Sequence, residues 1–293
     1  MEQEVFDKYV KAGRIASEVR EASRQIVKPG AKILDIAEQI EKMIKDKGAG
    51  IAFPVNISIN SIGAHDTADQ NDERMIQKDD VIKIDIGVHV DGYVGDTACT
   101  IAWDEKHQPL IQASEKALER AMELCKPGTN LGNIGAVIEK TIRDAGFMPV
   151  VNLTGHGLEQ FNIHAQPQIP NVKTKTDYCL QENQVIAIEP FATTGEGAIK
   201  ESEPTLIYSM VRERQTRNMD ARKIMRLMKE RNGLPFTVRW IPMSGFKLRL
   251  ALKELADKKV LYDYPVLREV SNGLISQTEH TIIVKERPIV TTL

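Results

Sequence analysis

Two aspartates in one predicted hairpin have the residue type and spacing that point most clearly to chemistry. Asp85 and Asp96 lie in two apolar, β-branched runs that flank Asp91-Gly92. An Asp-Gly dipeptide between such runs is the strongest local signal for a two-residue hairpin turn. With that turn Asp85 faces Ala98, and side-chain alternation places both aspartates on one face as diagonal neighbours.

The shared face gives the two carboxylates a predicted function. They repel each other on an apolar hairpin unless a positive group lies between them. We interpret Asp85 and Asp96 as ligands of a bound cation, since a cation removes this repulsion. The alternative is that both aspartates cap loop ends on a solvated face.

The composition is that of a globular protein with a large core. The chain has 293 residues, of which 42% are hydrophobic and 27% charged. Its net charge of -2 excludes a general electrostatic attraction to nucleic acid or membranes. No run approaches the ~20 apolar residues of a membrane span, and the first residues lack an apolar signal core. We therefore expect a cytoplasmic protein whose three cysteines are reduced.

The elements that must position the carboxylates occur twice along the chain. Residues 28–48 and 126–146 align without a gap, and each segment begins with Lys-Pro-Gly, continues as an amphipathic helix and ends at a glycine. Helical spacing of apolar residues also predicts helices over residues 4–26 and 109–125, one before each copy. The chain therefore consists of two related halves.

The strand that carries Asp85 has a counterpart in the second half. Val-Ile-Lys-Ile-Asp, residues 81–85, aligns with Val-Ile-Ala-Ile-Glu, residues 185–189, so Glu189 corresponds to Asp85. Two halves related by a pseudo-two-fold axis would bring both carboxylates to a central cleft. We expect an α/β (α+β) fold with a central antiparallel sheet and the helices outside.

The stretch from about Tyr208 to Val266 has no counterpart in the first half. Its apolar spacing predicts two helices. We expect a small helical insertion over residues 208–266 and a catalytic domain made of residues 1–207 and 267–293. The insertion is rich in Lys and Arg, which we interpret as a solvated helix face; a docking surface for RNA or a partner is the alternative.

Three more polar residues lie in apolar, strand-like runs, namely His156, Glu189 and Glu279. A charged group in such a run is costly unless it has a partner. Four carboxylates and one imidazole suit two divalent cations such as Mn, Fe(II), Co or Zn. Two such ions can activate water for hydrolysis. Taken singly, His156 also fits a capped loop residue, and Glu279 fits a buried ion-pair partner of Lys83.

The ordered motifs KIDIG with GDTA, TGHG with NIH, IEPF and EHT resemble those of the methionine aminopeptidases. The resemblance covers essentially the whole chain; the insertion is similar to that of the type II enzymes, and the start at the first helix is similar to the archaeal form. It implies the pseudo-two-fold pita-bread fold with a winged-helix-like insertion. It also implies removal of the N-terminal methionine from nascent proteins and peptides with a small second residue, by water that two metal ions activate.

The resemblance assigns roles to the polar residues. It implies that Asp96 and Glu279 bridge the metals, that Asp85 chelates one of them, and that His156 and Glu189 hold the other. Glu189 is also the family's proton acceptor and donor.

The resemblance also implies substrate contacts. His65 approaches the scissile amide, and His164 hydrogen-bonds the substrate carbonyl and stabilises the oxyanion. Phe53, Ile163 and Tyr264 form the methionine pocket, with plain core packing as the alternative for Phe53.

Two other functions stay open from the sequence. An Xaa-Pro aminopeptidase or prolidase has the same fold, but usually carries an additional N-terminal domain and lacks the insertion. A metal-free binding protein on this fold would lack the metal ligands. The expected partners are nascent peptide N-termini and, transiently, the ribosome. We expect a monomer without a membrane or a specific nucleic-acid partner.

Overall fold

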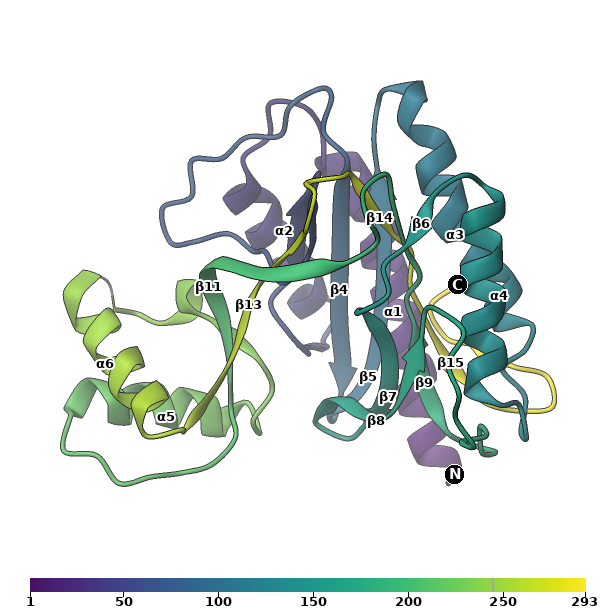
Figure 1. Ribbon diagram of the computed structural model, residues 1–293. Coiled ribbons are helices and arrows are strands. Elements are labelled where there is room, and N and C mark those ends of the chain that lie inside the picture. Colours follow the sequence, from purple (N-terminus) through teal and green to yellow (C-terminus); the bar gives the residue numbers. More distant parts are fainter. Residues whose placement is uncertain (244) are drawn as a thin grey trace.

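The computed structural model describes residues 1–243 and 245–293. Figure 1 shows a body in which long helices flank central strands, and a smaller lobe at the left that contains α5 and α6. The strands β11 and β13 run from the body into this lobe. None of the described helices combines the length and apolar composition that a bilayer span requires.

Each half of the chain begins with two helices, and a run of strands follows them. The α-helices are α1 (Gln3–Ile26), α2 (Ile33–Asp46), α3 (Gln108–Met122), α4 (Leu131–Asp144), α5 (Met219–Glu230) and α6 (Gly245–Asp257). The strands of the first half are β1 (Gly50–Ile51), β2 (Asn56–Ile59), β3 (Ile62–Ala64), β4 (Ile82–Val90) and β5 (Tyr93–Ile101). The later strands are β6 (Met148–Pro149), β7 (Thr154–Glu159), β8 (Asn162–Pro170), β9 (Val185–Ile188), β10 (Phe191–Thr193), β11 (Ile199–Met210), β12 (Phe236–Thr237), β13 (Leu261–Glu269), β14 (Ile275–Gln277), β15 (His280–Ile283) and β16 (Ile289–Val290).

The acidic hairpin has the predicted register. β4 and β5 pair without a bulge, with Val90 opposite Tyr93 and Asp85 opposite Ala98. Asp91 and Gly92 have φ values of 51° and 87°. Both values are positive, as a type I′ turn requires, and this turn matches the twist of the two strands.

The two predicted halves are also present. The helices α2 and α4 each have 14 residues and lie in the two copies of the repeat. Each copy has glycines in the left-handed region before and after its helix, Gly30 and Gly48 in the first and Gly128 and Gly146 in the second. The first copy packs into an apolar cluster with β2 and β4, and the second packs with β9 and β15. The two copies of the repeat therefore occupy corresponding positions in the apolar cores of the two halves.

Antiparallel pairing connects the halves. β4 pairs with β1, β2 and β5, while β9 lies between β7 and β15 in a separate five-stranded sheet. A bridge between Ala98 and Glu279 joins the hairpin to the segment just before β15. The helix α1 packs across β4 and β5, as the ribbon shows.

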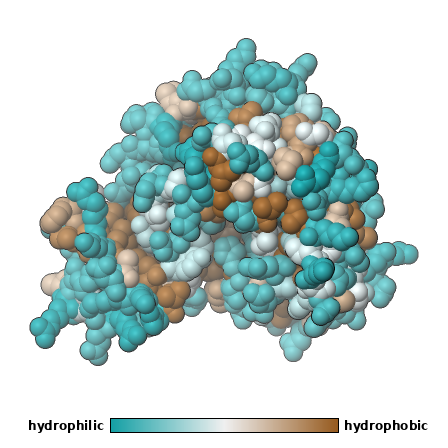
Figure 2. All heavy atoms as spheres, viewed as in Figure 1, coloured by the Kyte–Doolittle hydropathy of each residue, from teal (hydrophilic) through white to brown (hydrophobic). Residues whose placement is uncertain are grey.

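The lobe has an apolar cluster of its own. Residues of α5, β12 and α6 form it, together with the lobe-side ends of β11 and β13. Figure 2 shows the surface indented between this lobe and the body. The domain division at residues 208–266 remains a prediction.

A buried ion pair ties the lobe to the body. Arg239 donates from both terminal nitrogens to Glu41 of α2 at 2.7 and 2.9 Å, and Trp240 Nε1 donates to the same carboxylate at 2.8 Å. The side chains of Arg239 and Glu41 are each 5% exposed. Removing one member of such a pair leaves the other charge buried and unpaired.

We expect Glu41→Gln to lower the free energy of unfolding by about 3 kcal/mol, because Arg239 keeps its charge in a buried site. Urea denaturation measures the change. Glu38→Gln is the matched control, since Glu38 lies on the same helix and is exposed. Equal stability of the two variants would contradict the role of Glu41.

Candidate metal centre and substrate pocket

All ten residues singled out from the sequence line one cavity of about 350 Å³. They are Phe53, His65, Asp85, Asp96, His156, Ile163, His164, Glu189, Tyr264 and Glu279. The volume lies at the lower end of the ~300–1,000 Å³ typical of small-ligand sites. They come from five strands and four connecting segments, so only the folded chain brings them together.

Strand pairing places three carboxylates around Ala98. Asp85 lies opposite Ala98 in the hairpin. On the other side of β5, Ala98 and Glu279 exchange backbone hydrogen bonds of 3.1 and 3.3 Å. Asp96 lies two residues before Ala98, on the same face of β5. The three side chains therefore converge above one small residue.

The second half contributes His156 and Glu189. His156 of β7 lies opposite Ala187 of β9, two residues before Glu189. Its Nε2 lies 3.6 Å from Glu189 Oε1 and 3.9 Å from Asp96 Oδ2. Asp96, His156 and Glu279 each offer one atom to a group whose atoms all lie within 4.8 Å of one another. The imidazole of His156 therefore lies close to one carboxylate from each half, Asp96 and Glu189.

Lys83 does not neutralise this cluster. It is fully buried, and its Nζ donates to Asn60 O at 2.8 Å. Burial lowers its pKa to about 7. The alternative in which Glu279 pairs with Lys83 is therefore wrong.

Burial shifts the pKa of every member of the cluster. It raises the pKa of Asp85 to about 7, against a hydrogen bond from Gln277 that lowers it. Burial, with repulsion from neighbouring carboxylates, holds the pKa values of Asp96, Glu189 and Glu279 well above their usual range. Burial also lowers the pKa of His156 to about 3. Burial is the largest cause of every one of these shifts, because it disfavours the charged form of each group.

Three buried carboxylate oxygens have no hydrogen-bond partner among the described residues. They are Asp85 Oδ1, Asp96 Oδ1 and Glu279 Oε2. Buried polar atoms are normally satisfied, and unpaired ones call for an unseen water or ion. Oxygen ligands with one imidazole nitrogen fit a divalent transition ion. The residues present are therefore suited to hold metal.

The raised pKa of Asp85 predicts how the metal-free protein depends on pH. Its folded-state pKa of about 7 exceeds the unfolded value of about 3.9. The protonated form therefore stabilises the fold at low pH, and this contribution disappears as pH rises through 7. In chelator, we expect wild type to lose about 3 kcal/mol relative to Asp85→Asn between pH 4 and 8, measured by urea denaturation.

The comparison with Asp85→Asn is necessary because Lys83 and the buried histidines change stability with pH in the opposite direction. Parallel pH profiles for the two proteins would contradict the assignment. Adding Mn²⁺ at pH 8 should stabilise wild type more than the variant.

Two further histidines, His65 and His164, line the same cavity. The rings of His164 and His156 lie edge to face, with their centroids 4.8 Å apart. The ring centroid of Tyr264 lies 5.4 Å from that of His65 and 5.8 Å from that of His164. Burial lowers the pKa of both His65 and His164 to about 4. Both rings are therefore neutral at pH 7. His65 Nδ1 lies 3.2 Å from Pro265 O, and since a carbonyl only accepts, this nitrogen is the donor.

Apolar side chains form another part of the wall. Phe53 and Ile163 are buried and belong to one apolar cluster. Phe53 lies directly over Gly87, where an added Cβ would come within 2.2 Å of its ring. Tyr264 lies opposite Ile207 in the β11–β13 pair, at the base of the lobe. The cavity therefore joins an acidic end to an apolar and aromatic one.

Two polar neighbours of the cluster, Gln277 and Asn56, were not predicted from the sequence. Gln277 Nε2 donates to Glu189 Oε2 at 3.2 Å and to Asp85 Oδ2 at 3.5 Å. Asn56 lies opposite Asp85 in β2 and also lines the cavity. Gln277 had a usable signal, since it precedes Glu279 by two residues in a strand-like run and alternation places both on one face. Asn56 had none, because its pairing depends on tertiary structure.

Comparison with known proteins agrees with this geometry. The model of metallopeptidase family M24 matches residues 7–226. The methionine aminopeptidase of Pyrococcus abyssi is 45% identical over 290 residues, which are 98% of this chain and 98% of that protein. The methionine aminopeptidase of Thermococcus onnurineus is 46% identical over 288 residues, 97% of this chain and 98% of that protein.

Solved structures share the fold at low sequence identity. A thermophilic Arx1 superposes with a TM-score of 0.90 at 20% identity, covering 99% of this chain and 91% of its own. A methionine aminopeptidase from Thermotoga maritima has a TM-score of 0.73 at 21% identity and covers 100% and 98%. The prolidase from Pyrococcus furiosus has a TM-score of 0.65 at 19% identity, but this chain covers only 64% of it. The predicted pita-bread fold is confirmed.

Proposed function

The chain belongs to metallopeptidase family M24, and we propose that it removes the N-terminal methionine from nascent proteins and peptides whose second residue is small. The observation that carries this proposal is a cavity in which two buried carboxylates, two half-buried ones and a histidine face an apolar wall. The polar end suits hydrolysis, and the apolar end suits an unbranched thioether side chain.

We assign the metal ligands as the sequence predicted them. Asp85, Asp96, His156, Glu189 and Glu279 would hold two divalent ions, and Mn, Fe(II), Co and Zn all suit this ligand set. Asp96 and Glu279 would be the two ligands that both ions share. When bound, the ions would supply Lewis acidity that polarises the scissile carbonyl and lowers the pKa of water. The support is the set of unpaired, buried carboxylate oxygens.

The protein's own groups orient the peptide and move the proton. Because His65 Nδ1 donates to Pro265 O, its Nε2 is an acceptor, and we assign it to the N–H of the scissile amide. Neutral His164 donates to the substrate carbonyl and stabilises the charge that develops there. Glu189 accepts the proton of the attacking water and passes it to the leaving amine.

Phe53, Ile163 and Tyr264 bind the methionine side chain in this proposal. Phe53 and Ile163 are only 7% exposed, so the thioether would be shielded from water. Tyr264 brings an aromatic ring beside it, a favourable neighbour for sulfur. Tyr264 comes from β13, so the lobe at residues 208–266 would help to close the pocket.

The remaining parts of the proposal concern the protein's surroundings. We place the enzyme in the cytoplasm as a monomer that meets nascent chains during transient contact with ribosomes. Size-exclusion chromatography tests the monomer, and co-sedimentation with ribosomes tests the contact.

Hydrolysis of Met-Ala-Ser across a panel of Mn²⁺, Co²⁺, Fe²⁺ and Zn²⁺ tests the proposed function. We expect release of free methionine with at least one metal and no turnover of an Xaa-Pro peptide. Turnover of only the Xaa-Pro peptide would show a prolidase-like enzyme. Absence of turnover with every metal would favour a binding protein on this fold.

A further inference from the structure

A second cavity adjoins the substrate pocket on the lobe side. Its volume is about 330 Å³, and it shares His65, Asn152, Tyr262 and Tyr264 with the main cavity. The ring centroids of Tyr262 and Tyr264 lie 4.9 Å apart, and those of Tyr264 and His65 lie 5.4 Å apart. A continuous row of three rings therefore leads from the predicted position of the scissile bond into the second cavity. We call the second cavity the outer groove.

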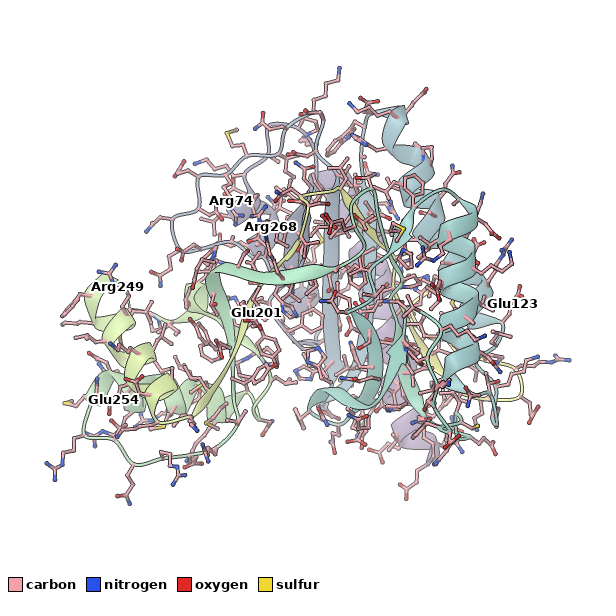
Figure 3. The ribbon with its side chains drawn as sticks, in the orientation of Figure 1. Arg74, Glu123, Glu201, Arg249, Glu254 and Arg268 are labelled. Carbon is pink, nitrogen blue, oxygen red and sulfur yellow. The ribbon has the colours of Figure 1, made fainter. Side chains whose placement is uncertain are left out.

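The lining of the outer groove is partly apolar and partly charged. Ile199, Pro265 and Leu267 line it, and so do two exposed acidic residues, Glu201 and Asp263. Neither carboxylate makes a side-chain hydrogen bond or an ion pair with any described residue. Lys200 also lines the groove, and its Nζ lies 3.5 Å from Val270 O. Figure 3 shows Glu201 at the junction of the lobe and the body.

The position of the outer groove relates it to the part of a peptide beyond the cleaved bond. An extended chain advances ~3.3 Å per residue, so three residues span about 10 Å. The methionine occupies the apolar end of the main cavity, and the ligands lie beneath the scissile bond. The third and later residues must leave this cavity, and the row of rings marks a continuous path to the outer groove.

We propose that the outer groove receives the third to fifth residues of the substrate, and that Glu201 and Asp263 favour chains with Lys or Arg at these positions. This inference rests on the proposed peptidase function and adds a substrate preference to it. The carboxylates are free to pair with the peptide because no described group already engages them. Peptides with acidic residues at the same positions meet two like charges.

The test compares kcat/KM for Met-Ala-Lys-Lys-Lys and Met-Ala-Glu-Glu-Glu. At low salt we expect wild type to prefer the basic peptide by about tenfold, the scale of two exposed ion pairs. The preference should shrink at 0.5 M salt, since exposed charges are screened. Both peptides present the same methionine and alanine, so their ratio cancels damage to folding or to metal binding.

Two variants reveal whether the carboxylates cause the preference. Glu201→Gln with Asp263→Asn should bring the ratio close to one, and Glu201→Lys with Asp263→Lys should invert it. Glu123→Gln with Asp177→Asn is the matched control, because both residues are exposed and line neither cavity. Figure 3 shows Glu123 on the far side of the body from Glu201.

Three results would overturn the inference. Equal turnover of the two peptides by wild type would remove the preference. An unchanged ratio in the lysine variant would remove its assignment to Glu201 and Asp263. Turnover of Met-Ala-Ser in either case would leave the proposed peptidase function intact, whereas absence of turnover for all three peptides would overturn both.

Discussion

Replacing Asp96 with Asn is expected to lower kcat/KM for Met-Ala-Ser by about 10³-fold or more, since metal-dependent stabilisation of the transition state supplies several kcal/mol. Asp96 is 3% exposed and lies between the two halves, near both His156 and Glu279. An amide has one carbonyl oxygen and no negative charge, so it cannot bridge two cations as a carboxylate can. Enzyme assays in excess Mn²⁺ and metal analysis after gel filtration measure the effect.

Asp91→Asn is the control for this variant. Asp91 belongs to the same hairpin, but its side chain is 67% exposed and lies at the turn. Asparagine tolerates the left-handed conformation of that position, so folding should be preserved. We expect unchanged activity and metal content for Asp91→Asn. Full activity of Asp96→Asn would refute the assignment of Asp96 as a metal ligand.

Replacing His164 with Ala is expected to lower kcat for Met-Ala-Ser by about 10²–10³-fold, the usual cost of losing one donor to a developing oxyanion. The ring lies beside His156, yet it makes no hydrogen bond to any described residue that its loss would break. Metal content should therefore stay near the wild-type value while kcat falls. This combination separates a substrate-binding role from a ligand role.

The pH profile gives a second readout for His164. Burial lowers its pKa to about 4, so the ring is a neutral donor throughout the neutral range. Its removal should reduce kcat by the same factor from pH 6 to pH 8. His107→Ala serves as the control, because His107 is buried outside the cavity. A loss of metal in His164→Ala would contradict the assignment.

Local patterns in the sequence predicted much of this protein. The Asp91-Gly92 turn determined the register of β4 and β5, since only a primed turn matches the strand twist, and that register put Asp85 and Asp96 on one face. The Lys-Pro-Gly repeat revealed two equivalent halves and identified Glu189 as the counterpart of Asp85. Backbone turns and side-chain alternation act over a few residues, so they can be read without the fold.

Contacts between distant segments decided the rest. The bridge between Ala98 and Glu279 joins residues 181 positions apart, and it completes the acidic cluster. The pairing of Asn56 in β2 with Asp85 in β4 also arises only from packing between distant segments. The same holds for the row of rings from His65 to Tyr262. The sequence alone therefore determined which residue types were available and on which faces they lie. Only the tertiary structure decided their mutual distances, because strand pairing between the halves and the docking of the lobe set them.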